Sequence, residues 1–211
     1  YNDRGISYAA SGRVDSAICD FNKMIESFPD AKDTYLNRGL AFKSKRDFAK
    51  AIDDFSTAIS MDSNYVIAYF NRGLAYHELR LYDSAVENFS AAIRIEPETA
   101  IYYFNRGRSH AANYDSEKAL ADYEKTFALD SLHAEAMINR AFLYYTLKKF
   151  DEAIEDCDKA LEVDSSLLMP YYVRGMCLHN KGKLEEAEKD YTKKKKNADR
   201  QPMAQKYKKR A

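Results

Sequence analysis

The sequence predicts an all-α protein in which antiparallel helix pairs stack into a solenoid. Three observations predict this class. Residues of the same kind recur every 34 positions along the chain. Within each copy, apolar residues are spaced by three and four positions, which is typical of one face of a helix. A short polar turn, such as KSKRD at 43–47, joins the two apolar segments of a copy.

The period is clearest in the small residues. A glycine column runs through the chain with one alanine substituted: Gly5, Gly39, Gly73, Gly107, Ala141 and Gly175. An alanine column keeps the same period: Ala17, Ala51, Ala85, Ala119, Ala153 and Ala187. A third column is mostly aromatic: Phe21, Phe55, Phe89, Tyr123, Cys157 and Tyr191. A repeat of this length indicates a solenoid or an array of one supersecondary unit.

Each copy contains two predicted helices of about 12–14 residues, a usual length in globular proteins. In the second copy, Tyr35, Gly39 and Phe42 follow helical spacing and share one face. The segment from Phe48 to Ile59 repeats that spacing after the turn. Pro29 and Pro97 follow the second segments of their copies, where proline marks a helix end.

Glycine on the first helix and alanine on the second allow close packing, and the aromatic residues fill the remaining space. One helix pair cannot bury both of its faces, so the copies are expected to stack. We predict a single solenoid over residues 1–199, with copies at about 1–31, 32–65, 66–99, 100–133, 134–167 and 168–199.

These columns resemble the tetratricopeptide repeat (TPR) in the aromatic residue four before the glycine, the aromatic residue three after it, the alanine column and the proline that ends two copies. The resemblance covers residues 1 to about 193. It implies a right-handed superhelix whose first helices line a concave groove. It also implies a non-enzymatic scaffold for protein–protein interaction that binds an extended peptide segment of a partner.

An arginine precedes the small residue in every copy: Arg4, Arg38, Arg72, Arg106, Arg140 and Arg174. A buried cation needs a partner, and one column of the second helices supplies it: Asp20, Asp54, Asn88, Asp122, Asp156 and Asp190. We predict that each arginine reaches this column in its own or an adjacent copy. The alternative is a row of free arginines that binds an acidic ligand.

A second face of the first helices, turned about 100° from the packed one, predicts the peptide-binding groove. Its asparagines are Asn37, Asn71, Asn105 and Asn139, and its apolar residues are Leu36, Leu40, Phe70, Leu74, Phe104, Ile138, Phe142, Tyr172 and Met176. An asparagine side chain can pair with a peptide group, and TPR proteins that resemble this one hold ligand backbone in this way. The alternative for the apolar residues is packing against the neighbouring copy.

Other site types find less support. The TPR clamp for the C-terminal carboxylate of chaperones needs Lys three residues before the glycine and Asn just after it. This chain has Leu36 and Leu40 there in the second copy and Phe70 and Leu74 in the third, so we do not expect that partner. The four histidines and three cysteines show no metal or redox spacing, and no glycine-rich phosphate loop occurs. We therefore expect no enzyme activity, catalytic residue, metal or cofactor.

The C-terminal part is basic, with 12 Lys or Arg against 5 Asp or Glu from Lys181 to Arg210, although the formal net charge is zero. Residues 200–211 predict a basic tail or a short capping helix. An alternative function is an adaptor that uses this tail on nucleic acid or an anionic surface, and another is a self-associating assembly factor; nucleic acid is the less favoured partner. No apolar run is long enough to span a membrane. Three unpaired cysteines favour the cytoplasm, and an extracytoplasmic or periplasmic location stays open if the N-terminus is processed.

Overall fold

A computed structural model describes residues 1–193, which contain helices and turns and no β-strand. The prediction of an all-α solenoid of helix pairs is confirmed. The basic tail or capping helix predicted at 200–211 lies outside the described residues.

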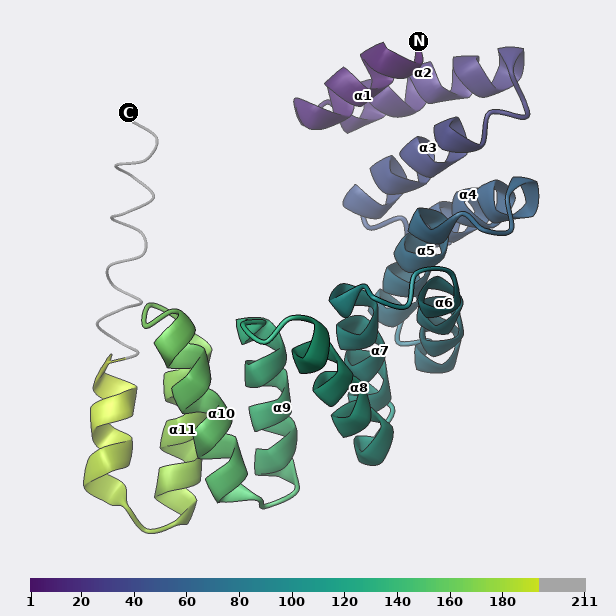
Figure 1. Ribbon diagram of the computed structural model, residues 1–211. Coiled ribbons are helices and arrows are strands. Elements are labelled where there is room, and N and C mark those ends of the chain that lie inside the picture. The colour runs from purple at the N-terminus through teal and green to yellow at the C-terminus, as the bar shows by residue number, and fades with distance from the viewer. Residues whose placement is uncertain (194–211) are drawn as a thin grey trace. The chain divides into compact units, whose positions relative to one another are not determined.

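The helices alternate between the predicted first and second segments of each copy (Figure 1). The first segments are α1 (Asn2–Ala10), α3 (Lys32–Ser44), α5 (Val66–Glu78), α7 (Ala100–Ala112), α9 (Ala134–Thr146) and α11 (Leu168–Asn180). The second segments are α2 (Val14–Ser27), α4 (Phe48–Met61), α6 (Tyr82–Ile95), α8 (Ser116–Leu129) and α10 (Phe150–Val163), followed by helical residues 184–193. From α2 to α11 every first helix has 13 residues and every second helix 14, as the spacing predicts.

The chain divides into two compact units, Tyr1–Asp115 and the part that begins at Ser116. In the first unit each helix packs on the next along the chain, and the first helices also pack on one another: α1 on α3, α3 on α5 and α5 on α7. Within residues 1–115 the second helices do not touch one another in this way. The first helices therefore form the inner, more closely spaced side of this unit, which we call the inner surface.

The second unit contains α8 to α11 and the helical residues 184–193. Its first helices α9 and α11 pack on one another, as their equivalents do in the first unit. The single solenoid over residues 1–199 stays a prediction.

The glycine column lies directly against the aromatic column. A Cβ atom added to Gly39 would lie 2.7 Å from Phe55 Cε1, and one added to Gly73 would lie 2.8 Å from Phe89 Cε1. Both rings are fully buried. Because no side chain fits in this space, the glycine sets how closely the two helices of a pair approach.

The one copy with alanine in this column differs on both sides of the contact. Ala141 lies in the same buried cluster as Cys157, which replaces the aromatic residue of the other copies. Ala141, which is larger than glycine, thus faces Cys157, which is smaller than an aromatic residue. This compensation keeps the volume between α9 and α10 nearly constant, as close packing requires.

The turns between first and second helices share a left-handed residue. Gly12 and Gly182 have φ values of 77°, and Arg46, Arg80, Tyr114 and Lys148 occupy equivalent positions with φ between 60° and 63°. At Arg46 the bonds Arg46 N–H to Lys43 O and Asp47 N–H to Phe42 O close the end of α3. This bonding is typical of a helix C-terminus that ends in a left-handed residue.

We predict that Gly73→Ala destabilises the protein. Alanine improves helix propensity by about 1 kcal/mol, but overpacking a filled core costs about 1–3 kcal/mol. The expected net loss in free energy of unfolding is about 1 kcal/mol, measured by urea denaturation. The variant Phe89→Cys reproduces the partner of Ala141, so the double variant should lose less stability than the two single losses added together. If the double variant lost as much stability as the two single variants together, the contact between residues 73 and 89 would not determine the packing of this helix pair.

Candidate functional site: the inner surface of the first helices

The arginine column is paired within the protein. Arg4, Arg38, Arg140 and Arg174 each make two hydrogen bonds to the aspartate of their own copy, at 2.6–2.9 Å. Arg72 donates to Asn88 at 2.7 Å. The predicted pairing is confirmed for these five copies, and these arginines do not form a row that is free for a ligand. The pairing of Arg106 with Asp122 stays a prediction.

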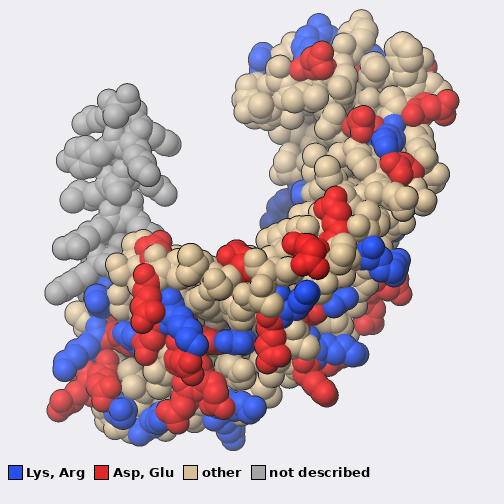
Figure 2. Space-filling view, in the orientation of Figure 1, with Lys and Arg blue, Asp and Glu red and all other residues tan. Residues whose placement is uncertain are grey.

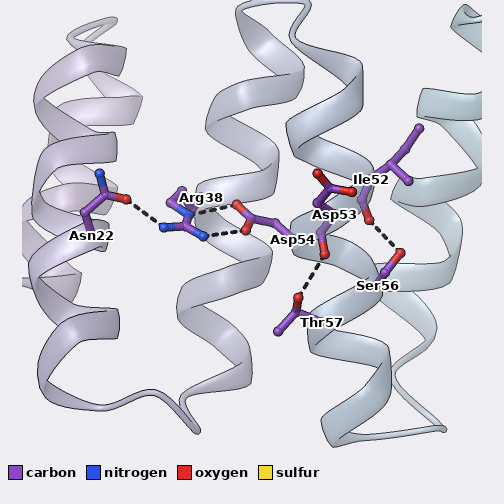
Figure 3. Close-up of polar contacts among 7 residues, drawn as sticks. All are labelled: Asn22, Arg38, Ile52, Asp53, Asp54, Ser56 and Thr57. Atoms are coloured by element: carbon purple, nitrogen blue, oxygen red, sulfur yellow. Dashed lines mark hydrogen bonds and ion pairs between the residues drawn. The ribbon is translucent and has the colours of Figure 1, made fainter.

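Several arginines of this column also donate to the preceding second helix. Arg38 on α3 donates to Asp54 on α4 and, at 2.7 Å, to Asn22 on α2, as Figure 3 shows. Arg72 and Arg106 donate in the same way to Ser56 at 2.9 Å and Ser90 at 3.1 Å. Each such guanidinium therefore links consecutive helix pairs.

The apolar residues predicted for the groove divide between packing and exposure. Leu36 and Phe104 are buried, and Leu36 belongs to a core cluster with Ala68 of the next pair. Phe70 is half-buried between the rings of Phe89 and Tyr102, at 5.9 and 5.2 Å between centroids. In the first unit this column thus packs between copies, as the alternative interpretation held.

Other members of the predicted set are more accessible. Leu40, Leu74, Ile138 and Met176 are half-buried. Phe142 on α9 and Tyr172 on α11 are 49% and 37% exposed. The accessible part of the predicted apolar face therefore lies mainly in the second unit.

The asparagines are held by their own helices. Asn71, Asn105 and Asn139 each donate from Nδ2 to the backbone carbonyl four residues earlier, at 2.8 Å. Asn37 instead lies 3.4 Å from Oδ1 of Asn2. Asn71 and Asn105 are buried and Asn139 is half-buried.

Sequence reasoning missed an exposed apolar column on the same face, six residues before the glycine. Ile67 on α5 and Ile101 on α7 are 48% and 37% exposed, and Met169 on α11 is exposed as well. The backbone carbonyls of Ile67 and Ile101 accept the hydrogen bonds from Nδ2 of Asn71 and Asn105, which lie four residues later. The available signal was an apolar residue one turn before each of these asparagines.

Three basic residues complete the inner surface of the first unit. Lys43 on α3 donates to Oδ1 of Asn71 on α5. Arg108 on α7 donates to Oδ1 of Asn105 at 3.2 Å and lies over the ring of Phe104. His77 on α5 contacts Ser109 on α7 through Nδ1 at 2.9 Å.

Family models described as tetratricopeptide repeat match residues 2–65, 36–100 and 70–119, residues 134–167, and residues 170–193. The first three matches overlap and alone span more than half of the chain. The chain belongs to the tetratricopeptide repeat family. A comparison with curated proteins found no match.

Several solved TPR structures share the fold. PilF of Pseudomonas aeruginosa has a TM-score of 0.79 at 17% identity, over 100% of this chain and 96% of that one. MamA from Desulfovibrio magneticus RS-1 has a TM-score of 0.75 at 17% identity, over 79% and 94%. YrrB, described as a TPR protein with an unusual peptide-binding site, has a TM-score of 0.67 at 22% identity, over 90% and 97%.

Membership of the TPR family gives the chain the general role of a scaffold for protein–protein interaction. TPR proteins bind protein partners and are generally not enzymes. Within residues 1–193 no helix is long and apolar enough to cross a membrane. The same residues contain no group of His, Cys, Asp or Glu side chains that could hold a metal ion.

We predict that the Arg140–Asp156 pair is structural. Asp156 is 2% and Arg140 16% exposed, so Asp156→Ala leaves a largely buried guanidinium without its carboxylate. The expected loss is about 2–4 kcal/mol of unfolding free energy in urea denaturation. The double variant Arg140→Met/Asp156→Leu should recover part of this loss because it removes both charges. Glu155→Ala, at an exposed neighbour, is the control and should change little; equal losses in the two alanine variants would refute the assignment.

Proposed function

We propose that the inner surface of the TPR helices binds an extended peptide segment of a partner protein. The observation that supports this most directly is the pair of exposed isoleucines, Ile67 and Ile101, on the side of the first unit where α3, α5 and α7 are most closely spaced. Large apolar side chains that stay exposed next to one another favour an interaction surface.

Helix spacing and strand geometry are compatible in this arrangement. Packed helices lie about 8–10 Å apart, and an extended chain advances about 3.3 Å per residue. A segment that crosses from α5 to α7 therefore places residues about three positions apart over Ile67 and Ile101. Each contact that removes such a side chain from water contributes about 1–2 kcal/mol.

The predicted pairing of successive asparagines with the backbone of the segment, which we call the asparagine ladder, belongs to this proposal in a modified form. One N–H of Asn71 and of Asn105 bonds to the helix backbone. An asparagine amide carries two N–H groups, so the second can donate to a carbonyl of the segment. The bond to the helix orients the amide, which lowers the entropy lost on binding.

The second unit offers a corresponding apolar surface of its own. Phe142 on α9 and Met169 and Tyr172 on α11 are exposed, and α9 packs on α11. The Phe142 ring lies 6.3 Å from that of Tyr145, and the Tyr172 ring lies 6.3 Å from that of Tyr191. These aromatic side chains favour apolar residues of a partner in this unit as well.

Random peptides of about twelve residues, long enough at about 3.3 Å per residue to cross α3, α5 and α7, can be selected on the wild-type protein by phage display. We predict that the double variant Ile67→Ser/Ile101→Ser binds the selected peptides about tenfold or more weakly, because two apolar contacts are lost. Fluorescence polarisation gives the Kd. Leu79→Ser/Leu81→Ser, at exposed leucines near the α5–α6 turn, is the matched control and should bind normally. Equal affinity in the two variants would contradict the proposal.

The ladder has a separate test. Asn71→Ala/Asn105→Ala should weaken the same peptides while the circular dichroism of the helices stays unchanged. Both amides are buried, so a cost of about 1 kcal/mol each in stability is expected as well, and affinity is compared at a temperature where the variant is fully folded. Unchanged affinity would remove the ladder from the proposal.

A further inference from the structure

Two cations on the inner surface, Lys43 and Arg108, lack a carboxylate partner of the kind that most arginines of the repeated column have. Arg38 on α3 pairs with Asp54, whereas Lys43 on the same helix reaches only an amide oxygen, on Asn71. Arg108 likewise reaches the amide oxygen of Asn105. Among the residues that the structure describes, no carboxylate oxygen lies within 4.0 Å of either cation.

Both cations are half-buried, so they lose hydration without gaining a counter-charge. Burial lowers the pKa of Lys43, which shows that the surroundings disfavour its charge. A partly desolvated cation attracts an anion more strongly than an exposed one does, because the effective dielectric constant is lower there.

The two cations contact equivalent asparagines of neighbouring first helices. Lys43 contacts Asn71 on α5, and Arg108 contacts Asn105 on α7. Because α5 packs on α7 and packed helices lie about 8–10 Å apart, the two contacts are separated by about that distance. An extended segment spans that distance in two or three residues.

His77 supplies no negative charge that could neutralise Lys43 or Arg108. The hydroxyl of Ser109 donates to the carbonyl oxygen of Asn105 at 3.0 Å, so Ser109 accepts from Nδ1 of His77. Burial and then the charge of Arg108 lower the pKa of His77, which disfavours the charged imidazolium form. Glu78, the next residue on α5, lies 3.6 Å from Arg46.

We propose that Lys43 and Arg108 bind two Asp or Glu carboxylates of the partner segment, two or three residues apart. This inference rests on the proposed function and names the chemistry of the segment. It differs from the TPR carboxylate clamp, whose lysine position three residues before the glycine is Leu36 or Phe70 in this chain. Since Ile67 and Ile101 lie on the same surface, the segment combines apolar side chains with the acidic pair.

The surroundings favour an acidic peptide over nucleic acid. A phosphate backbone is bound by many cations in a row, whereas here there are two cations, and one of them, Arg108, lies over the ring of Phe104. On the face shown in Figure 2, Lys and Arg are interspersed with Asp and Glu over the described residues and do not form a broad basic surface. The formal net charge of the whole chain is zero.

The experiment uses the full chain and the peptides selected on it, each synthesised also with Glu and Asp replaced by Gln and Asn. We expect selected peptides to contain two acidic residues two or three positions apart, and the neutral versions to bind about tenfold more weakly. For the variant Lys43→Gln/Arg108→Gln, the Kd values of the acidic and the neutral peptides should differ by less than about twofold. Lys23→Gln/Arg94→Gln removes the same charge from exposed positions on α2 and α6 and should keep the wild-type difference.

The outcomes separate this inference from the proposed function. Peptides that lose affinity on Ile67→Ser/Ile101→Ser but show no acidic pair, or no response to Lys43→Gln/Arg108→Gln, would overturn the inference and leave the proposed function. If the peptides bind the Ile67→Ser/Ile101→Ser variant as tightly as the wild type, both the proposed function and this inference would be overturned. Tight binding of a fluorescent single-stranded oligonucleotide that is lost on Lys43→Gln/Arg108→Gln, with no acid-dependent peptide binding, would assign the cations to phosphate and overturn the inference.

Discussion

The contact between a small residue on one helix and a ring on the next determines the rest of this structure. Gly5 meets Phe21, Gly39 meets Phe55 and Gly175 meets Tyr191, each with less than 3.0 Å for an added Cβ atom. The arginine of each copy and its aspartate, which is Asn88 in the third copy, come one residue before the two members of this contact. When the ring lies on the glycine, the guanidinium and the carboxylate are therefore brought together without any further adjustment.

This arrangement explains why the arginines do not contribute cations to the inner surface. Their charges are used where consecutive pairs meet, by the carboxylate of one second helix and by a polar residue of the preceding one. A bidentate pair between guanidinium and carboxylate has a fixed geometry, so the repeated pairs also fix the register between copies. The inner surface is left with Lys43 and Arg108 as cations that have amide partners only.

The sequence allowed the helix pairs, their lengths and the arginine pairing to be predicted, because each depends on a contact that recurs at the same place in every copy. It did not separate buried Leu36 and Phe104 from exposed Phe142. A helical period gives the direction of a side chain but not how far the neighbouring pair covers it. The left-handed turn residues were not predicted, since four of these positions hold Arg46, Arg80, Tyr114 and Lys148 in place of glycine. Ile67 and Ile101 were missed because their column also contains Asp33 and Glu135, which hides an apolar pattern.

Positions that repeat and positions that vary therefore have different meanings in this chain. A contact that builds the stack must be the same in each copy, whereas the side chains of a bound segment differ from residue to residue. The columns that vary on the inner surface, those of Ile67 and Arg108 among them, are for that reason the ones expected to read a partner's sequence. The asparagines repeat although they lie on the same surface. A peptide backbone is the one feature of a ligand that is itself periodic, so a repeating amide suits the backbone while the varying neighbours select its side chains.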